Sequence, residues 1–218
     1  MWPMVGAMLR VLVISLLLLV GIMLVMTGVR RPLPAPEIAT YFESPLPLPE
    51  FSLVDKTGEI FTRESLRGRF NLMFFGFTNC PDICPLTLSV LADAKAELGR
   101  QPQTVPGVIF VSVDPDRDTP ESIGAYLERF DASFAGVTGT EDSLRPLLSA
   151  LGVSVQRLQL PGQPSYSVTH NGTIYLLGPQ AALIATMSGS PTAAEIVTDF
   201  RRVRQLHIRR RTGTDAST

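Results

Sequence analysis

Residues 70–77 constrain the fold of this chain more than any other segment, because almost every side chain in them is apolar. A strand with one solvated face alternates apolar and polar residues, whereas a nearly continuous apolar run is typical of a central strand covered on both faces. Residues 107–113 form a second run of this kind. Two covered strands need helices on both sides, so we expect an α/β domain with three layers.

The rest of the chain supplies the other strands and the helices of such a domain. Helices are expected at 86–98, from Thr119-Pro120 to about 130, at 141–151 and from Thr192 onward, and shorter strands at 134–138 and 183–187. Two hairpins are also predicted, one turning at 55–58 and one at Asn171-Gly172, a favoured two-residue turn.

Two cysteines, Cys80 and Cys84, follow the first apolar run, and the chain contains no others. Ligands of such sheets gather where the strands end, so the cysteine loop and the acidic loop 114–118 should lie at one edge. If Pro85 occupies the first turn of a helix, Cys84 lies near its N-cap, where the helix dipole favours the thiolate. The pair can share a soft metal ion such as Cu(I) or Zn, or it can close as a disulfide.

Two thiolates leave a metal site incomplete, and the chain has only two histidines to complete it. His170 lies beside the predicted Asn171-Gly172 turn, which would present it rigidly. The residues alone leave open whether His170 is a ligand or a structural residue. His207 lies in an arginine-rich segment, and we expect it to be solvated and without a role in the site.

Four aspartates lie close to the cysteines in this scheme, at Asp82, Asp114, Asp116 and Asp118. Carboxylates suit hard cations such as Mg²⁺ or Ca²⁺, but the EF-hand spacing is absent and the neighbouring sulfurs favour a softer ion. Asp118 is interpreted as a residue that starts a helix. Asp114 is a candidate for orienting a metal-ligating side chain without contacting the metal itself.

Residues 11–29 contain no charged side chain and are flanked by Arg10 and Arg30. A helix of nineteen residues spans about 28 Å, close to the ~30 Å of a bilayer core. The run is long for a signal peptide, and no A-x-A cleavage site follows it. We therefore interpret it as an uncleaved single-pass anchor, whose orientation the flanking arginines leave open.

The charge of the chain is unevenly distributed. Residues 32–200 hold ten basic and nineteen acidic residues, a net charge of −9, whereas 201–211 hold six arginines and no acid. An acidic body argues against nucleic acid as the main partner. The basic end could contact anionic lipid or an acidic protein.

Three motifs together resemble the Sco/SenC family. They are Phe74-Phe-Gly-Phe-Thr-Asn-Cys80-Pro-Asp-Ile-Cys84-Pro, then Val111-Ser-Val-Asp-Pro-Asp-Arg-Asp-Thr-Pro120, and finally Tyr166-Ser-Val-Thr-His170. The resemblance covers roughly residues 48–204 together with the N-terminal apolar segment. Many members of the family carry an aspartate directly before the histidine, where this chain has Thr169.

The resemblance implies a thioredoxin-like fold with a mixed central sheet and three copper ligands, Cys80, Cys84 and His170. It implies binding of Cu(I), Cu(II) or both, and assistance in delivering copper to subunit II of cytochrome c oxidase or to another copper protein. Some members of the family act as thiol-disulfide reductases. An anchored member lies in the bacterial inner membrane with its domain in the periplasm, or in the mitochondrial inner membrane of a eukaryote.

The expected organisation follows from the resemblance and the segments above. Residues 1–10 form a cytoplasmic N-terminus, 11–29 the transmembrane anchor and 30–49 a proline-rich spacer without regular structure. Residues 50–207 form the thioredoxin-like copper-binding domain, expected to be a monomer, and 208–218 a disordered basic and polar tail.

The main alternative is a metal-independent thiol-disulfide oxidoreductase that uses Cys80 and Cys84 as its redox pair. Thioredoxin-type enzymes have two residues between their cysteines, whereas this chain has three, and disulfide exchange does not require His170. A thiol peroxidase, a third alternative, fits paired cysteines less well. Whether the chain is an enzyme is thus left open.

Overall fold

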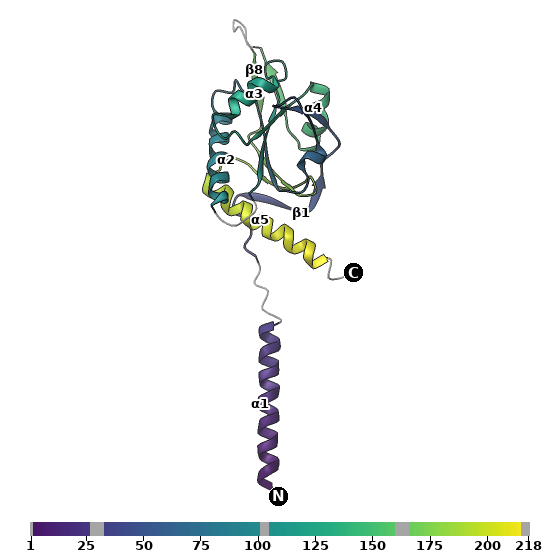
Figure 1. Cartoon of the computed structure of the whole chain (residues 1–218), viewed down its shortest axis with the longest axis vertical. Coiled ribbons are helices and arrows are strands. Elements are labelled where there is room, and N and C mark those ends of the chain that lie inside the picture. The colour runs from purple at the N-terminus through teal and green to yellow at the C-terminus, as the bar shows by residue number, and fades with distance from the viewer. Residues whose placement is uncertain (1, 27–32, 101–104, 160–165, 215–218) are drawn as a thin grey trace. The chain divides into compact units, whose positions relative to one another are not determined.

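The computed structural model describes residues 2–26, 33–100, 105–159 and 166–214 (Figure 1). It divides into two compact units, Met1–Pro34 and Ala35–Thr218. The described residues of the first unit include the helix α1 (Trp2–Met26). Within the described residues, no helix combines the length and the hydropathy that a membrane span requires. The anchor predicted at 11–29 is therefore not confirmed.

The second unit is a mixed α/β domain built on one large sheet. In chain order its elements are β1 (Ala39–Pro47), β2 (Ser52–Asp55), β3 (Ile60–Thr62), the 3₁₀ helix η1 (Arg63–Leu66), β4 (Asn71–Gly76), α2 (Ile83–Gly99), β5 (Gly107–Ser112), α3 (Pro120–Leu127), β6 (Ala135–Thr138), α4 (Glu141–Ala150), β7 (Val155–Leu158), β8 (Ser167–His170), β9 (Ile174–Gly178), β10 (Ala182–Met187) and α5 (Ala193–Thr214).

The large sheet has eight strands in the order β1-β10-β9-β4-β5-β6-β2-β3, and β7 and β8 form a separate two-stranded ribbon. The pairs β4–β5 and β5–β6 are parallel, while β4 pairs with β9 in the antiparallel direction. The predicted mixed sheet is thus confirmed. The two apolar runs that predicted it are β4 and β5 at its centre, and every residue of β4 is buried.

Alternating side chains of β4 divide the core into two halves. Leu72 and Phe74 belong to the cluster that includes α2 and α5, whereas Met73 and Phe75 belong to the cluster that includes α4. Figure 1 shows α2 and α4 on opposite sides of the sheet. This confirms the three layers, and it explains why β4 has no polar face.

The hairpin predicted at 55–58 and the start of α3 are also as expected. Strands β2 and β3 pair in the antiparallel direction around the turn. Helix α3 begins at Pro120 with Thr119 as its N-cap, and the hydroxyl of Thr119 accepts the amide N–H of Ser122 at 3.2 Å.

The prediction of a spacer without regular structure at 30–49 is wrong for β1, which lies inside that range and pairs with β10 at the edge of the sheet. The segment is held by Asp199 of α5, whose side chain is fully buried. Its carboxylate accepts the backbone N–H groups of Glu37, Ile38 and Ala39 at 2.7–2.8 Å. A buried carboxylate needs such donors, so residues 37–39 belong to the domain.

The hairpin predicted at Asn171-Gly172 is also wrong. Strand β8, which ends at His170, pairs with β7 in the ribbon, whereas β9 lies between β4 and β10 in the large sheet. Neither Asn171 nor Gly172 has the positive φ that the favoured two-residue turn requires. Residues 171–173 instead carry the chain from the ribbon to the sheet.

The C-terminal segment differs from its prediction as well. Helix α5 continues to Thr214, past Ile208, where a disordered tail was expected to begin. His207 is not solvated, because only 5% of it is exposed. Its ring packs edge-on against Phe70 at 5.9 Å between centroids, and Nε2 lies 3.3 Å from the side-chain oxygen of Gln180. His207 is therefore a structural residue of the core.

We expect the fragment 35–218 to fold, because it contains the whole sheet and both halves of its core. A shorter fragment, 48–218, lacks β1 and leaves Asp199 buried without its three donors. Its free energy of unfolding should be lower by about 3 kcal/mol or more, which is the cost of stranding a buried charge. Urea denaturation of both fragments measures the difference, and equal transition midpoints would contradict the role given to residues 37–39.

Candidate metal centre

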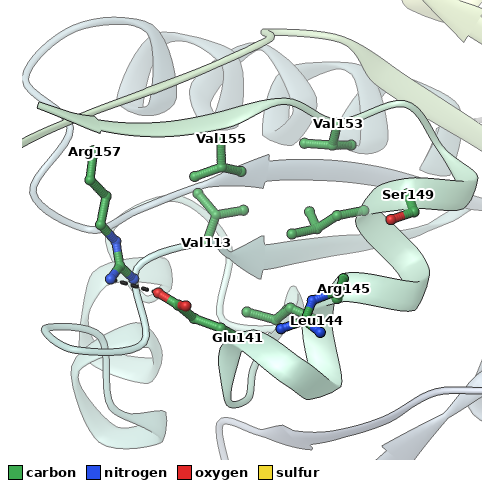
Figure 2. A pocket seen from close by; sticks show the side chains of 9 residues that line it. Val113, Glu141, Leu144, Arg145, Ser149, Val153, Val155 and Arg157 are labelled. Atoms are coloured by element: carbon green, nitrogen blue, oxygen red, sulfur yellow. Dashed lines mark ion pairs between the residues drawn. The ribbon is translucent and has the colours of Figure 1, made fainter.

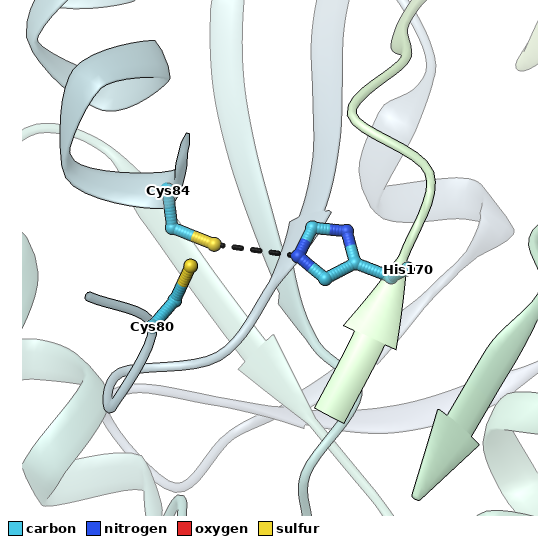
Figure 3. A group of neighbouring side chains, drawn as sticks. All are labelled: Cys80, Cys84 and His170. Carbon is cyan, nitrogen blue, oxygen red and sulfur yellow. Dashed lines mark hydrogen bonds between the residues drawn. The ribbon is translucent and has the colours of Figure 1, made fainter. Parts of the chain in front are cut away.

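Cys80, Cys84 and His170 come together at the edge of the sheet where β4 and β5 end (Figure 3). Cys80 lies in the loop after β4, Cys84 in the first turn of α2, and His170 at the end of β8. Their ligand atoms all lie within 4.8 Å of one another, and Cys84 Sγ is 3.4 Å from His170 Nε2. Two sulfurs and one imidazole nitrogen are a donor set that suits a soft metal ion such as copper.

The backbone around the cysteines allows this close approach. The N–H of Cys80 donates to the carbonyl of Phe77 at 3.2 Å, which turns the chain after β4. A Cβ atom on Gly76 would lie 2.9 Å from Cys84 Sγ and 2.7 Å from the ring of Phe110. Only glycine at position 76 therefore leaves room for the sulfur.

The two thiols are chemically unequal. The hydrogen bond from Cys84 lowers the pKa of Cys80 to about 4, aided by the backbone N–H groups of Asp82 and Cys84. The same contact with Cys80, together with full burial, raises the pKa of Cys84. Cys80 is thus the thiolate of the metal-free protein, and Cys84 holds its proton. Helix α2 begins at Ile83, so Cys84 is already inside the first turn and not at the N-cap.

His170 presents one particular nitrogen to the sulfurs. Its Nδ1 lies 3.1 Å from the carbonyl oxygen of Asn171, which can only accept, so Nδ1 carries the proton. Nε2, the atom that faces Cys84 in Figure 3, then has its lone pair free for a metal. The rings of Phe74 and Phe77 each pack edge-on against the imidazole at 6.0 Å and fix its plane.

Asp118 holds the cysteine loop against the neighbouring strand. Its buried carboxylate accepts the N–H of Thr78 at 2.9 Å, the hydroxyl of Thr78 at 2.6 Å and the hydroxyl of Ser112 at 2.6 Å. The interpretation of Asp118 as a helix-start residue is wrong, because Thr119 caps α3. Residues 40 positions apart form this contact, and no local pattern in the sequence marks it.

Asp114 supports His170 from a distance. It is fully buried, pairs with Arg117, and accepts the hydroxyl of Tyr166. The guanidinium of Arg117 stacks 4.1 Å from the ring centroid of Tyr166 and donates to its carbonyl at 3.2 Å. These contacts hold the start of the segment that leads into β8, so Asp114 acts on the strand that carries His170 and not on the imidazole itself.

Arg157 of β7 fixes the β7–β8 ribbon through ion pairs with residues outside it. It pairs with Asp116 at 2.9 Å and with Glu141 of α4 at 2.7 Å, the second contact being drawn in Figure 2. Figure 2 also shows the cavity of about 340 Å³ that lies between this ribbon and α4. Asp116 is therefore engaged in an ion pair and is not a metal ligand.

The remaining predicted residues lie outside the centre. Thr169 is exposed, and its hydroxyl bonds the carbonyl of Gln156 at 3.4 Å. Strand alternation turns it away from the side on which His170 lies. Asp82 is exposed at the N-cap of α2. Among the described residues, Cys80, Cys84 and His170 form the one group of three whose atoms could hold a metal.

The chain matches the SCO1/SenC family model over residues 43–205. It is 33% identical over 170 residues to a SCO2-like protein of Rickettsia conorii, covering 77% of this chain and 82% of that protein. It is 39% identical over 137 residues to a putative copper-binding protein of Stutzerimonas stutzeri, covering 62% of this chain and 66%, just under two thirds, of that protein.

A solved structure agrees with these matches. The crystal structure of yeast Sco1 with copper bound superimposes with a TM-score of 0.65 at 32% identity, and covers 72% of this chain and 87% of that chain.

The unequal thiols predict unequal alkylation of the reduced, metal-free domain. Because the pKa of Cys80 is about 4, its rate of reaction with iodoacetamide should stay level from neutral pH downward and fall only near that value. Cys84 should react slowly throughout. Replacing the donor in Cys84→Ala should raise the pKa of Cys80 and move the fall in rate toward neutral pH. Mass spectrometry of the labelled peptides measures both rates, and equal labelling of the two cysteines would refute the assignment.

Proposed function

The chain belongs to the SCO1/SenC family, and we propose that it binds copper through Cys80, Cys84 and His170 and helps to deliver it to subunit II of cytochrome c oxidase. The observation that carries the proposal is the convergence of two sulfurs and Nε2 within 4.8 Å. Copper is the cargo of this reaction. The donor set fits it, because thiolates and imidazole prefer soft or borderline ions.

Each residue of the centre has a different role in binding copper. Cys80 is a thiolate before the metal arrives, so it provides the first ligand without losing a proton. Cys84 must release its proton when it binds, and its burial keeps water from the sulfur. Asn171 fixes the tautomer that leaves Nε2 of His170 free. Cys80 and His170 are partly exposed, so an acceptor's ligands would approach copper from their side.

The membrane location is part of the same proposal. It is supported by the uncharged run at 11–29, which is long enough for a bilayer core. We propose that this run anchors the chain in the bacterial inner membrane, or in the mitochondrial inner membrane of a eukaryote, with the domain facing the compartment that contains subunit II. The domain is proposed to act as a monomer.

A second function is favoured by the unequal thiols, namely reduction of a disulfide in the copper acceptor. The partly exposed Cys80 thiolate attacks the acceptor's disulfide and forms a mixed disulfide, releasing one acceptor thiolate. The sulfur of Cys84, on losing its proton, then attacks Cys80 and releases the second. The acceptor gains two electrons, and the chain ends with a Cys80–Cys84 disulfide. This state cannot bind copper through sulfur, so the two functions exclude each other at any moment.

Replacing His170 separates the two functions. His170→Ala should weaken Cu(II) binding by more than about 100-fold, the most that loss of a supporting residue costs. Cu(I) binding should weaken less, because two thiolates can still hold this ion. Disulfide reduction, which needs only the cysteines, should continue. Parallel titrations with each copper state, and an assay with a small disulfide, measure these effects.

The matched control is His207→Gln, which keeps a side chain able to bond Gln180 and removes the other histidine. It should leave the affinity for both copper states unchanged. A loss of Cu(II) in His207→Gln with normal binding in His170→Ala would overturn the choice of ligand.

Deleting the gene should lower cytochrome c oxidase activity, and added copper should restore it, because the proposed role is supply of the metal. The wild-type gene should complement the deletion without added copper, and Cys80→Ser should not, since it removes the thiolate. Oxidase activity and copper content of isolated membranes measure the effect. Normal oxidase activity in the deletion strain would show that the acceptor is a different copper protein.

A further inference from the structure

A second concave site lies far from the metal centre, between the last turns of α5 and the loop before β4. Its volume is about 410 Å³. The side chains and backbone that line it come from Gly68, Arg69, Phe70, Pro179, Arg204, His207, Ile208, Arg211 and Thr212. None of these lining residues is acidic. We call this site the basic pocket.

Part of the wall of the basic pocket is buried, whereas two of its three arginines are exposed. His207 and Phe70 are buried and pack edge-on against each other. Burial and the neighbouring charge of Arg211 lower the pKa of His207, so its ring stays neutral at pH 7. Arg69 and Arg211 are exposed, and among the described residues neither has a carboxylate partner. The pocket is thus a formed hollow edged by uncompensated positive charge.

The charge of the pocket contrasts with that of the domain. Residues 32–200 carry a net charge of −9, and two of the nearby arginines are already paired, Arg202 with Glu37 and Arg210 with Glu43. An anionic surface repels such a body everywhere except at its basic end. The pocket is therefore the place where an extended anionic surface would contact the domain.

The chain leading to the proposed anchor joins the domain at α5, the helix whose last turns line the basic pocket. Ala39 bonds Asp199 through its N–H, while the carbonyl of Ala35 accepts Arg202 one turn later on the helix. Traced forward from there, the chain runs along α5 toward its arginine-rich end, where Glu43 pairs with Arg210 at 2.8 Å. In the sequence, Ala35 follows the uncharged run at 11–29 by only a few residues.

We propose that the basic pocket binds the phosphate of anionic lipid headgroups and docks the domain on the bilayer surface. The choice of lipid as the source of the phosphate depends on the membrane anchor proposed above. The affinity of the pocket for phosphate does not depend on that anchor. Arginine guanidinium groups suit phosphate because they donate two parallel hydrogen bonds to it.

Docking through the basic pocket determines where the metal centre points. Phe70 precedes β4 at the pocket, and Cys80 follows β4 at the metal centre, so the six residues of the strand separate the two sites. At ~3.3 Å per residue this is about 20 Å. Figure 1 shows β8, which ends in His170, and the C-terminal part of α5 at opposite ends of the domain. A docked domain therefore presents its metal centre away from the lipid.

The test is co-sedimentation of the fragment 35–218 with vesicles of phosphatidylcholine, with and without phosphatidylglycerol. We expect binding only to the anionic vesicles, and weaker binding as salt is raised. The double variant Arg69→Ala/Arg211→Ala should bind about 25-fold more weakly, about fivefold for each arginine lost near the surface. Copper binding and circular dichroism of this variant should be unchanged, which separates this inference from the proposed function.

The matched control is Arg100→Ala/Arg145→Ala, which removes the same charge from arginines whose side chains are 75% and 69% exposed, at the C-cap of α2 and on α4. It should bind anionic vesicles as the wild type does. Equal losses in the two double variants, binding to pure phosphatidylcholine, or no vesicle binding would each overturn the proposal. Binding of inorganic phosphate by a domain that binds no anionic vesicles would also overturn it, because the ligand would then be a free anion.

Discussion

The parallel pairing of β4 with β5 is the constraint on which the rest of this structure depends. It runs in register from Asn71 and Gly107 to Gly76 and Ser112, so both strands end at the same edge. The cysteine loop leaves one strand there and the acidic loop leaves the other. Asp118 of the acidic loop then accepts hydrogen bonds from Thr78 of the cysteine loop and from Ser112 at the end of β5. Without that register, the sulfurs would have no fixed position relative to the loop that supports His170.

The sequence predicted those parts of the fold whose physical cause is local. Strands β4 and β5 are covered on both faces and are continuously apolar, and α3 begins with its own cap at Thr119. Local sequence patterns gave wrong predictions where a segment distant in the sequence determines the structure. The prolines around β1 suggested a spacer, but β10 and Asp199 pair with this segment from more than 130 positions away. At Asn171-Gly172 the local turn preference was overridden, because β7 pairs with β8 and the central sheet pairs with β9.

The candidate site shows the same division. Cys80 and Cys84 were visible as a pair, and the resemblance to a family selected His170 over His207. The reason His207 is not a ligand lies in its contacts with Phe70 and Gln180, which no charge pattern near it reveals. The inequality of the thiols depends likewise on three-dimensional burial. The sulfur of Cys84 lies against Gly76, and its thiol donates a hydrogen bond to Cys80. The spacing of the two cysteines in the sequence gives no sign that the two sulfurs differ.

The hydrogen bonds between Asp199 and the backbone of residues 37–39 have a mechanical consequence. Tension on the chain from its N-terminal side reaches three hydrogen bonds to one buried carboxylate before it reaches the edge strand. These bonds share the load, and breaking them exposes a charge to an apolar core, which resists the pull at its first step. Strand β1 is thereby shielded from being peeled off β10 bond by bond. A domain fastened in this way can be pulled from its N-terminal side while the geometry of Cys80, Cys84 and His170 stays undisturbed.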